Sequence, residues 1–224
     1  MKLETVNAIV GCLALVLASV TAWAQFAPTS DNLQVVSEGR VNLGRPTDVV
    51  KNGTFDLEKN TPQPTIGPAT WKVRVHNETD RVVSIVGWQI FLLTKDGGRV
   101  KYSAMRELLS PVDPSLPILN LPINIAAHET AAYFVSASVP FDGSAIEKSA
   151  CFEPRRSLAD TEQCVLASGK DIFGNSVSVV RYDPDHPEIF SATWEGQMNA
   201  PSFYLEFETA DGSVFPAVLS FLPF

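Results

Sequence analysis

The sequence predicts a mainly β fold in which antiparallel strands pack as a β-sandwich. Apolar and polar residues alternate along segments such as Trp71–Val75 and Phe203–Phe207, as they do in strands that bury one face. Turn signals such as Gly97-Gly98 and Asp211-Gly212 separate these segments. Stretches with helical periodicity are few. Short strands joined by tight turns are typical of two facing antiparallel sheets.

Residues 1–24 have the pattern of a secretory signal peptide. An apolar run over 8–20 follows a charged start, and Ala22-Trp23-Ala24 supplies small residues at a cleavage site. The run is shorter than the about 20 apolar residues of a membrane-spanning helix. We expect cleavage after Ala24 and a periplasmic or secreted protein without a transmembrane segment. Two alternatives stay open: a retained membrane anchor, and lipidation at Cys12.

Residues 25–68 are expected to form an N-terminal arm or opening strands, and residues 69–224 the sandwich domain. Proline and glycine interrupt the first of these regions throughout, which limits its strands to short segments. Further along, Lys95-Asp96-Gly97-Gly98 predicts a hairpin, because glycine accepts the positive φ that such turns require. Gly87 predicts a bend or bulge within the apolar run Arg81–Thr94.

The strands expected from these patterns cover most of the mature chain. They are Leu33–Val36, Asp48–Lys51, Trp71–Val75, Val82–Val86, Trp88–Leu93, Arg99–Ser103, Ile118–Leu121, Ile123–Ile125, Thr130–Val139, Ser176–Tyr182, Ile189–Trp194, Ser202–Thr209 and Val214–Phe221.

An insertion at about 144–175 breaks the strand rhythm. Ser157 followed by Asp160 and Glu162 is the signal of a helix start, so we expect one short helix there. Once the leader has been removed, Cys151 and Cys164 are the remaining cysteines, and in an oxidising compartment they pair most simply as one disulfide. Closing so short a loop stabilises a fold by about 3 kcal/mol in the chain-entropy model.

Three segments in order resemble bacterial immunoglobulin-like and fibronectin type III-like modules. They are Trp71-Lys72-Val73-Arg74-Val75-His76-Asn77, then Val86-Gly87-Trp88-Gln89-Ile90, then the Ile125–Glu129 turn into Thr130–Val139. The resemblance covers about residues 70–139 and implies an immunoglobulin-like sandwich with a binding or spacer role. The chain departs from antibody domains in its insertion and in lacking their inter-sheet cysteines. The resemblance carries over no site residue.

Composition narrows the range of partners. The formal net charge of −8 survives loss of the leader, which removes one lysine and one glutamate. Phosphate recognition depends on clustered Lys and Arg, and this chain has no basic stripe, so nucleic acid is not expected as a partner. We expect a protein or carbohydrate partner outside the cytoplasm.

Motifs for catalysis are absent from the sequence. It contains no G-x-S-x-G elbow, H-E-x-x-H pair, P-loop or dinucleotide fingerprint. Trp71 and Trp88 lie in apolar strand patterns and are expected in the core, whereas Trp194 is a candidate for exposure. We therefore predict no catalytic residues and no bound cofactor.

One loop is a candidate metal site. Asp183, Asp185 and Glu188 alternate with prolines, and their carboxylates are the oxygen ligands that Ca²⁺ prefers. The spacing does not match an EF-hand, and an ordinary solvated turn explains the same residues.

The function expected from the sequence is that of an exported, non-enzymatic binding or structural protein. Its insertion and the loops near 105–117 and 183–188 would carry recognition, because loops on a rigid scaffold usually do. Two alternatives remain: a secreted carbohydrate-active hydrolase whose site is hidden in the sequence, and a small outer-membrane β-barrel suggested by the terminal Phe224.

Overall fold

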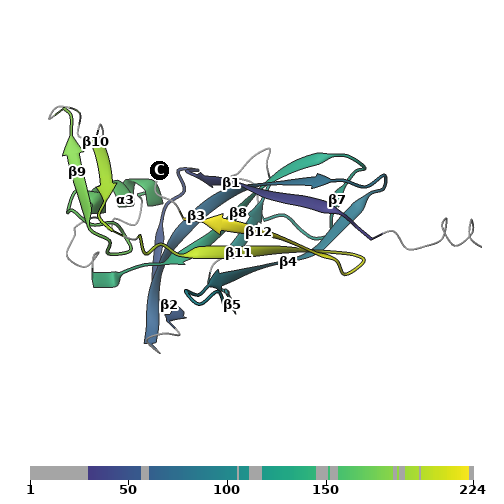
Figure 1. Cartoon of the computed structure of the whole chain (residues 1–224), viewed down its shortest axis with the longest axis horizontal. Coiled ribbons are helices and arrows are strands. Elements are labelled where there is room, and N and C mark those ends of the chain that lie inside the picture. The colour runs from purple at the N-terminus through teal and green to yellow at the C-terminus, as the bar shows by residue number, and fades with distance from the viewer. Residues whose placement is uncertain are drawn as a thin grey trace, which may run out of the picture. The chain divides into compact units, whose positions relative to one another are not determined.

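A computed structural model describes residues 30–56, 61–104, 106–110, 118–144, 151, 156–183, 186, 190–196 and 198–221. The helix and strands lie in one compact unit, Asn32–Phe224 (Figure 1). The fold is mainly β, with two five-stranded antiparallel sheets, one two-stranded sheet and one short helix in the described part. Within the same residues, no helix is long and apolar enough to cross a membrane.

The first sheet is built around one long strand. Its members are β1 (Leu33–Val41), β2 (Asp48–Asp56), β3 (Thr61–Asn77), β6 (Arg106–Leu109) and β8 (Thr130–Pro140). The order is β1-β3-β8-β6, and β2 also pairs with β3. The strand β3 is 17 residues long, so β2 pairs with its first part and β1 with its last. The region 25–68 therefore supplies two strands and the start of a third to this sheet.

The second sheet faces the first. Its members are β4 (Val83–Leu93), β5 (Arg99–Lys101), β7 (Ile123–Ile125), β11 (Ser202–Thr209) and β12 (Val214–Ser220). The order is β12-β11-β4-β5, with β7 paired to β4. The Asp211-Gly212 turn joins β11 to β12 as the sequence predicts, and Gly212 has a positive φ of 85°.

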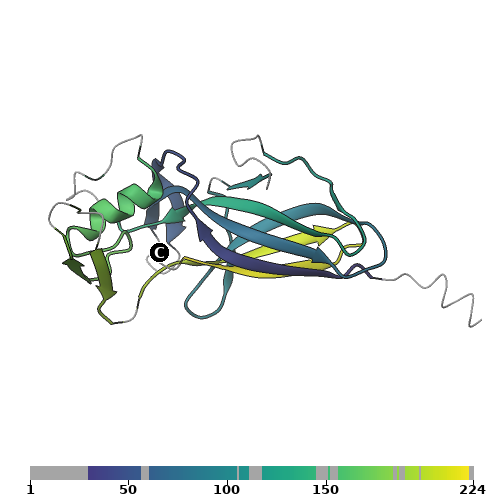
Figure 2. The ribbon, with the colours of Figure 1, turned by 90° about the horizontal axis from the view of Figure 1, so that it is seen from above.

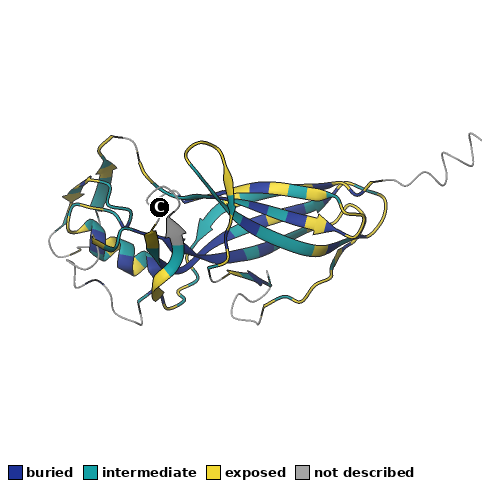
Figure 3. Cartoon of the chain, turned by 90° about the horizontal axis from the view of Figure 1, so that it is seen from below, coloured by how far each residue is buried: buried dark blue, intermediate teal, exposed yellow. Residues whose placement is uncertain are grey.

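Both sheets contribute to one core, which makes the fold a β-sandwich. The Trp71 ring of β3 packs edge-on against Phe203 of β11, with ring centroids 5.5 Å apart. Leu205 and Phe207 are also fully buried, which confirms the alternation seen in the sequence. Along the strands, buried residues alternate with more exposed ones, and much of the loops is exposed (Figure 3). The Trp71 indole N–H also donates to the carbonyl of Ser220, 2.9 Å away.

A small subdomain, which we call the cap, lies at one end of the sandwich (Figure 2). It consists of α3 (Leu158–Leu166), the antiparallel hairpin of β9 (Val177–Arg181) and β10 (Phe190–Trp194), and the loop 167–176. The disulfide between Cys151 and Cys164 attaches to this helix. The predicted helix and the predicted disulfide are both confirmed.

Three strand predictions need correction. The strands expected as short segments within 25–68 are longer: β1 and β2 have nine residues each, because each pairs along β3. The two strands expected on either side of Gly87 form one continuous strand, β4, because the irregularity there is only a register shift opposite Glu208 and Thr209. The expected strand at Ile118–Leu121 is wrong. The backbone N–H of Leu119 donates to the carbonyl of Leu108 at 2.8 Å, but this segment forms no ladder.

Candidate functional site

The helix of the cap starts where its own sequence dictates. The Ser157 hydroxyl accepts from the backbone N–H of Asp160 at 3.2 Å, and the Asp160 carboxylate accepts from the backbone N–H of Ser157 at 3.1 Å. This reciprocal pair is a capping box, which satisfies two backbone donors at the helix start. Leu158 and Val165 are buried, so one face of the helix packs inward.

Asp171 organises the loop that follows the helix. One carboxylate oxygen accepts from the backbone N–H groups of Phe173 and Asn175, each at 2.9 Å. The other accepts from the Asn175 amide at 2.7 Å and from the Trp194 indole N–H at 2.9 Å. These four donors fill the lone-pair sites of the carboxylate. Asp171 therefore fixes the loop and the Trp194 ring together.

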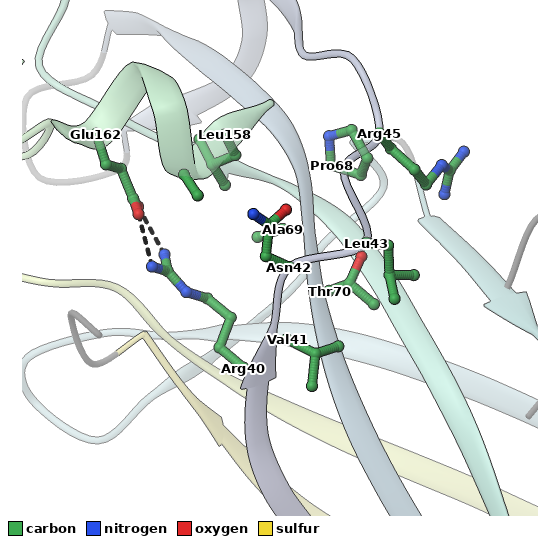
Figure 4. A pocket seen from close by; sticks show the side chains of 11 residues that line it. Arg40, Val41, Asn42, Leu43, Arg45, Pro68, Ala69, Thr70, Leu158 and Glu162 are labelled. Carbon is green, nitrogen blue, oxygen red and sulfur yellow. Dashed lines mark hydrogen bonds and ion pairs between the residues drawn. The ribbon is translucent and has the colours of Figure 1, made fainter. Parts of the chain in front are cut away.

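A buried ion pair ties the cap to the first sheet. Both terminal nitrogens of Arg40, on β1, donate to the Glu162 carboxylate on α3 at 2.6 Å (Figure 4). The two side chains are 4% and 15% exposed. The Arg40 guanidinium also stacks on the Phe221 ring, 3.8 Å from its centre. One arginine thus holds both the helix and the segment that follows β12.

The pKa of Glu162 reflects this buried setting. Burial is the largest influence on its pKa and raises it, whereas the hydrogen bond and charge of Arg40 lower it. The charge of Asp171 raises the pKa further, and the result lies above the usual value. The hollow beside Glu162 shown in Figure 4 has a volume of about 20 Å³, which is room for about one water molecule.

A larger cavity of about 250 Å³, the cap pocket, lies between α3, the β9–β10 hairpin and the end of the sandwich. Its apolar walls come from widely separated parts of the chain: Phe173, Phe190, Trp194, Met198 and Phe221. Glu162 and Asp171 line it as well. An apolar cavity of about 150 Å³ is large enough to bind benzene, so this pocket has room for an aromatic ring.

The predicted tryptophan positions are mostly matched by the structure. Trp71 is fully buried, and Trp88 is partly buried against the core. Trp194 is half-buried in the wall of the cap pocket. The sequence singled out the insertion as a recognition element, but it missed Arg40, Glu162 and Asp171 as partners. No local pattern marks these residues, because only folding brings them together.

The candidate calcium loop is described in part. Asp183 is half-buried, and its carbonyl accepts from the backbone N–H of His186 at 3.3 Å. Asp185 and Glu188 lie outside the described residues, as does most of the loop 105–117. In the part of the chain that is described, no three His, Cys, Asp or Glu side chains are grouped to hold a metal. The calcium site stays a prediction, and a chelator that leaves Tm unchanged would rule it out.

Comparison of this chain with protein-family models, curated proteins and solved structures finds no significant match.

Proposed function

We propose that this protein is an exported, non-enzymatic binding module that holds an apolar, ring-sized group of its partner in the cap pocket. The observation that carries the proposal is the pocket itself: about 250 Å³, walled by four aromatic rings and Met198. Cavities with mostly apolar walls and a few fixed polar groups are the usual form of ligand sites.

The pocket is built from rigid parts. Asp171 fixes the Trp194 ring, the disulfide Cys151–Cys164 constrains α3, and Arg40 ties α3 to the sandwich. A site whose walls are already held in place loses little conformational entropy on binding, which favours affinity. The cap is therefore better suited to recognition than a flexible loop would be.

Export is part of the proposal. The leader pattern at residues 1–24 and the disulfide agree with a protein that works in an oxidising compartment, periplasmic or extracellular. The resemblance of residues 70–139 to immunoglobulin-like and fibronectin type III-like modules also supports a binding role, because such modules commonly bind or space other domains.

Indole is a suitable probe of the cap pocket because it has the size and flatness of an aromatic side chain. We expect indole to bind the purified protein with a Kd on the order of 1 mM, measured by saturation-transfer NMR. Ala192 lies in the pocket wall on β10, so Ala192→Leu should fill the cavity and abolish binding. Ala132→Leu, on β8 and outside the pocket, is the matched control and should bind indole normally. Equal binding by both variants would overturn the proposal.

A second candidate function, glycoside hydrolysis, is favoured by one observation. Two carboxylates, Glu162 and Asp171, line the same pocket, and burial raises the pKa of Glu162, as a general acid requires. However, Asp171 already accepts four hydrogen bonds, and Glu162 is held by both nitrogens of Arg40. Binding is therefore the better supported function. If the protein hydrolyses nitrophenyl glycosides and Glu162→Gln abolishes this activity, hydrolysis becomes the better supported function.

A further inference from the structure

The cap pocket adjoins a second, more open hollow. This groove has a volume of about 520 Å³ and lies between the start of β3 and the β4–β5 hairpin. Phe173 and Ala200 line both hollows, so the groove and the pocket meet at these two residues. The two hollows are therefore neighbours, and a ligand that extends across Phe173 and Ala200 would contact both.

One wall of the groove is the free edge of a sheet. The strand β5 ends the order β12-β11-β4-β5 and, among described strands, pairs with β4 alone. The backbone N–H of Tyr102 donates to the carbonyl of Ile90 at 2.9 Å, and Lys101 lies opposite Phe91. Residues of an antiparallel ladder alternate between bonding their partner strand and facing away from it. The backbone N–H and C=O of Lys101 therefore face away from β4, and Lys101 lines the groove.

The charge at this edge selects the kind of partner. Lys95 and Lys101 are exposed on the groove wall, in a chain whose net charge is −8. The acidic residue of the lining, Asp142, is half-buried, and its carboxylate accepts from the backbone N–H and the hydroxyl of Ser144. Arg99, on the same strand, already pairs with Glu206 at 3.0 Å, whereas no described residue forms an ion pair with Lys101. A second copy of this chain paired through β5 would place like charges side by side, which is unfavourable. An acidic segment would be attracted instead.

We propose that the groove and the cap pocket together bind one extended, acidic segment of a partner protein. Its backbone adds to β5 as a further strand and bonds the free N–H and C=O of Lys101. An acidic side chain lies near the Lys101 ammonium, and an apolar or aromatic side chain enters the cap pocket. Strand addition of this kind is a general mode of peptide recognition, in which backbone bonds give affinity and pockets give specificity. This inference rests on the proposed function of the pocket.

The test uses a phage-displayed library of random nonapeptides selected on the full chain. We expect enriched peptides to combine an aromatic or large aliphatic residue with at least one Asp or Glu, and to bind more weakly at high salt. Synthetic copies in which successive backbone nitrogens are methylated should include one that binds at least about tenfold more weakly, because it lacks a bond to β5.

Two substitutions at one position separate charge from backbone pairing. Lys101→Gln keeps the backbone N–H and should weaken binding about threefold while removing most of its salt dependence. Lys101→Pro also removes the N–H that faces the groove and should weaken binding at least about tenfold. Proline is tolerated at such edge positions, and the Tm of this variant checks its folding. The methylated peptides give the same information without changing the protein.

The outcomes distinguish this inference from the proposed function. If indole binds but no peptide is enriched, the pocket proposal stands and strand addition is wrong. The same conclusion follows if peptides bind, Ala192→Leu blocks them, and neither Lys101→Pro nor backbone methylation has an effect. If Ala192→Leu blocks neither indole nor peptides, both proposals are wrong.

Discussion

The side chain of Asn77 connects two turns of the sandwich through hydrogen bonds. It is fully buried at the end of β3. Its amide nitrogen lies 2.7 Å from the carbonyl oxygen of Arg81, 2.9 Å from that of Ala126 and 3.1 Å from that of Ile125. Its amide oxygen accepts from the backbone N–H and the hydroxyl of Thr79 at 2.9 and 2.7 Å. Asn77 thereby links the turn after β3 to the turn after β7.

Removing this amide should destabilise the protein strongly. Asn77→Ala leaves buried backbone groups without partners, and each such group costs about 1–3 kcal/mol. We expect the free energy of unfolding, measured in urea, to fall by about 2–3 kcal/mol. Asn124→Ala is the control, because Asn124 is exposed and accepts from the Ser84 hydroxyl at the surface; it should change stability by less than about 0.5 kcal/mol. Similar losses in both variants would contradict this account.

Ionisation of Tyr133 makes the free energy of unfolding depend on pH in the alkaline range. Burial, with a smaller effect from the charge of Glu129, raises the pKa of Tyr133 to about 12. The unfolded chain loses this proton near pH 10, so stabilisation from the neutral side chain is complete below that pH. It is lost as the pH rises from about 10 through about 12, because only the unfolded state is then ionised.

The variant Tyr133→Phe has no proton to lose. Its free energy of unfolding should decline less between pH 9.5 and pH 12 than that of the unmodified protein, with a difference of about 2 kcal/mol. Burial also raises the pKa of Tyr102, so some alkaline loss should remain in the variant. Parallel pH profiles for the two proteins would show that Tyr133 ionises equally in both states.

At the scale of elements, the attachment of α3 depends on contacts distant in sequence. Its start is local, through the capping box of Ser157 and Asp160. Its position against the sandwich depends on Arg40, which lies 122 residues before Glu162. Thr47 adds a second link, since its backbone N–H and hydroxyl both donate to the carbonyl of Arg156 at 2.8 Å.

Breaking the ion pair between Arg40 and Glu162 should destabilise the cap more than the sandwich. Arg40→Met leaves the Glu162 carboxylate buried without its partner, and such losses amount to about 3–5 kcal/mol. The double variant Arg40→Met with Glu162→Leu removes both charges and should recover most of that loss. Hydrogen exchange would show the effect first at the backbone amides of α3. If exchange rises equally in β3 and β8, the pair stabilises the whole fold instead.

Considered as a whole, the molecule joins a sandwich with one continuous core to a cap constrained by covalent and ionic links. The core runs from Leu33 on β1 to Phe221 after β12. The cap adds the disulfide Cys151–Cys164, whose closure belongs to an oxidising environment. The disulfide is consistent with a protein that works outside the cytoplasm.

Export can be tested on the whole molecule. Protein recovered from the periplasm or the medium should begin at Gln25 when its N-terminus is sequenced, because the leader pattern predicts cleavage after Ala24. Under denaturing but non-reducing conditions, it should contain no thiol that reacts with an alkylating reagent. An intact leader on protein found in the cytosol, with both cysteines reduced, would refute export.

Local signals predicted much of the fold. Alternation placed the strands β8 and β11, glycine placed the hairpin turn before β5, and the Ser157 signal placed α3. Errors occurred where the outcome depends on a neighbouring strand. Gly87 lies at a register shift that does not end β4, because β11 continues to pair on both sides of it. Three of the four residues of the Ile118–Leu121 segment are apolar, but no ladder forms on it.

The sequence alone determined the β-sandwich class, the helix start and the cysteine pair, because each depends on residues near one another along the chain. The candidate site depends on contacts between segments that are distant in sequence. Arg40, Glu162 and Trp194 come from three separate segments, and the cap pocket exists only once these segments are packed. The alternation of apolar and polar residues indicates which side of a strand faces water. It does not indicate which distant segments line the same cavity.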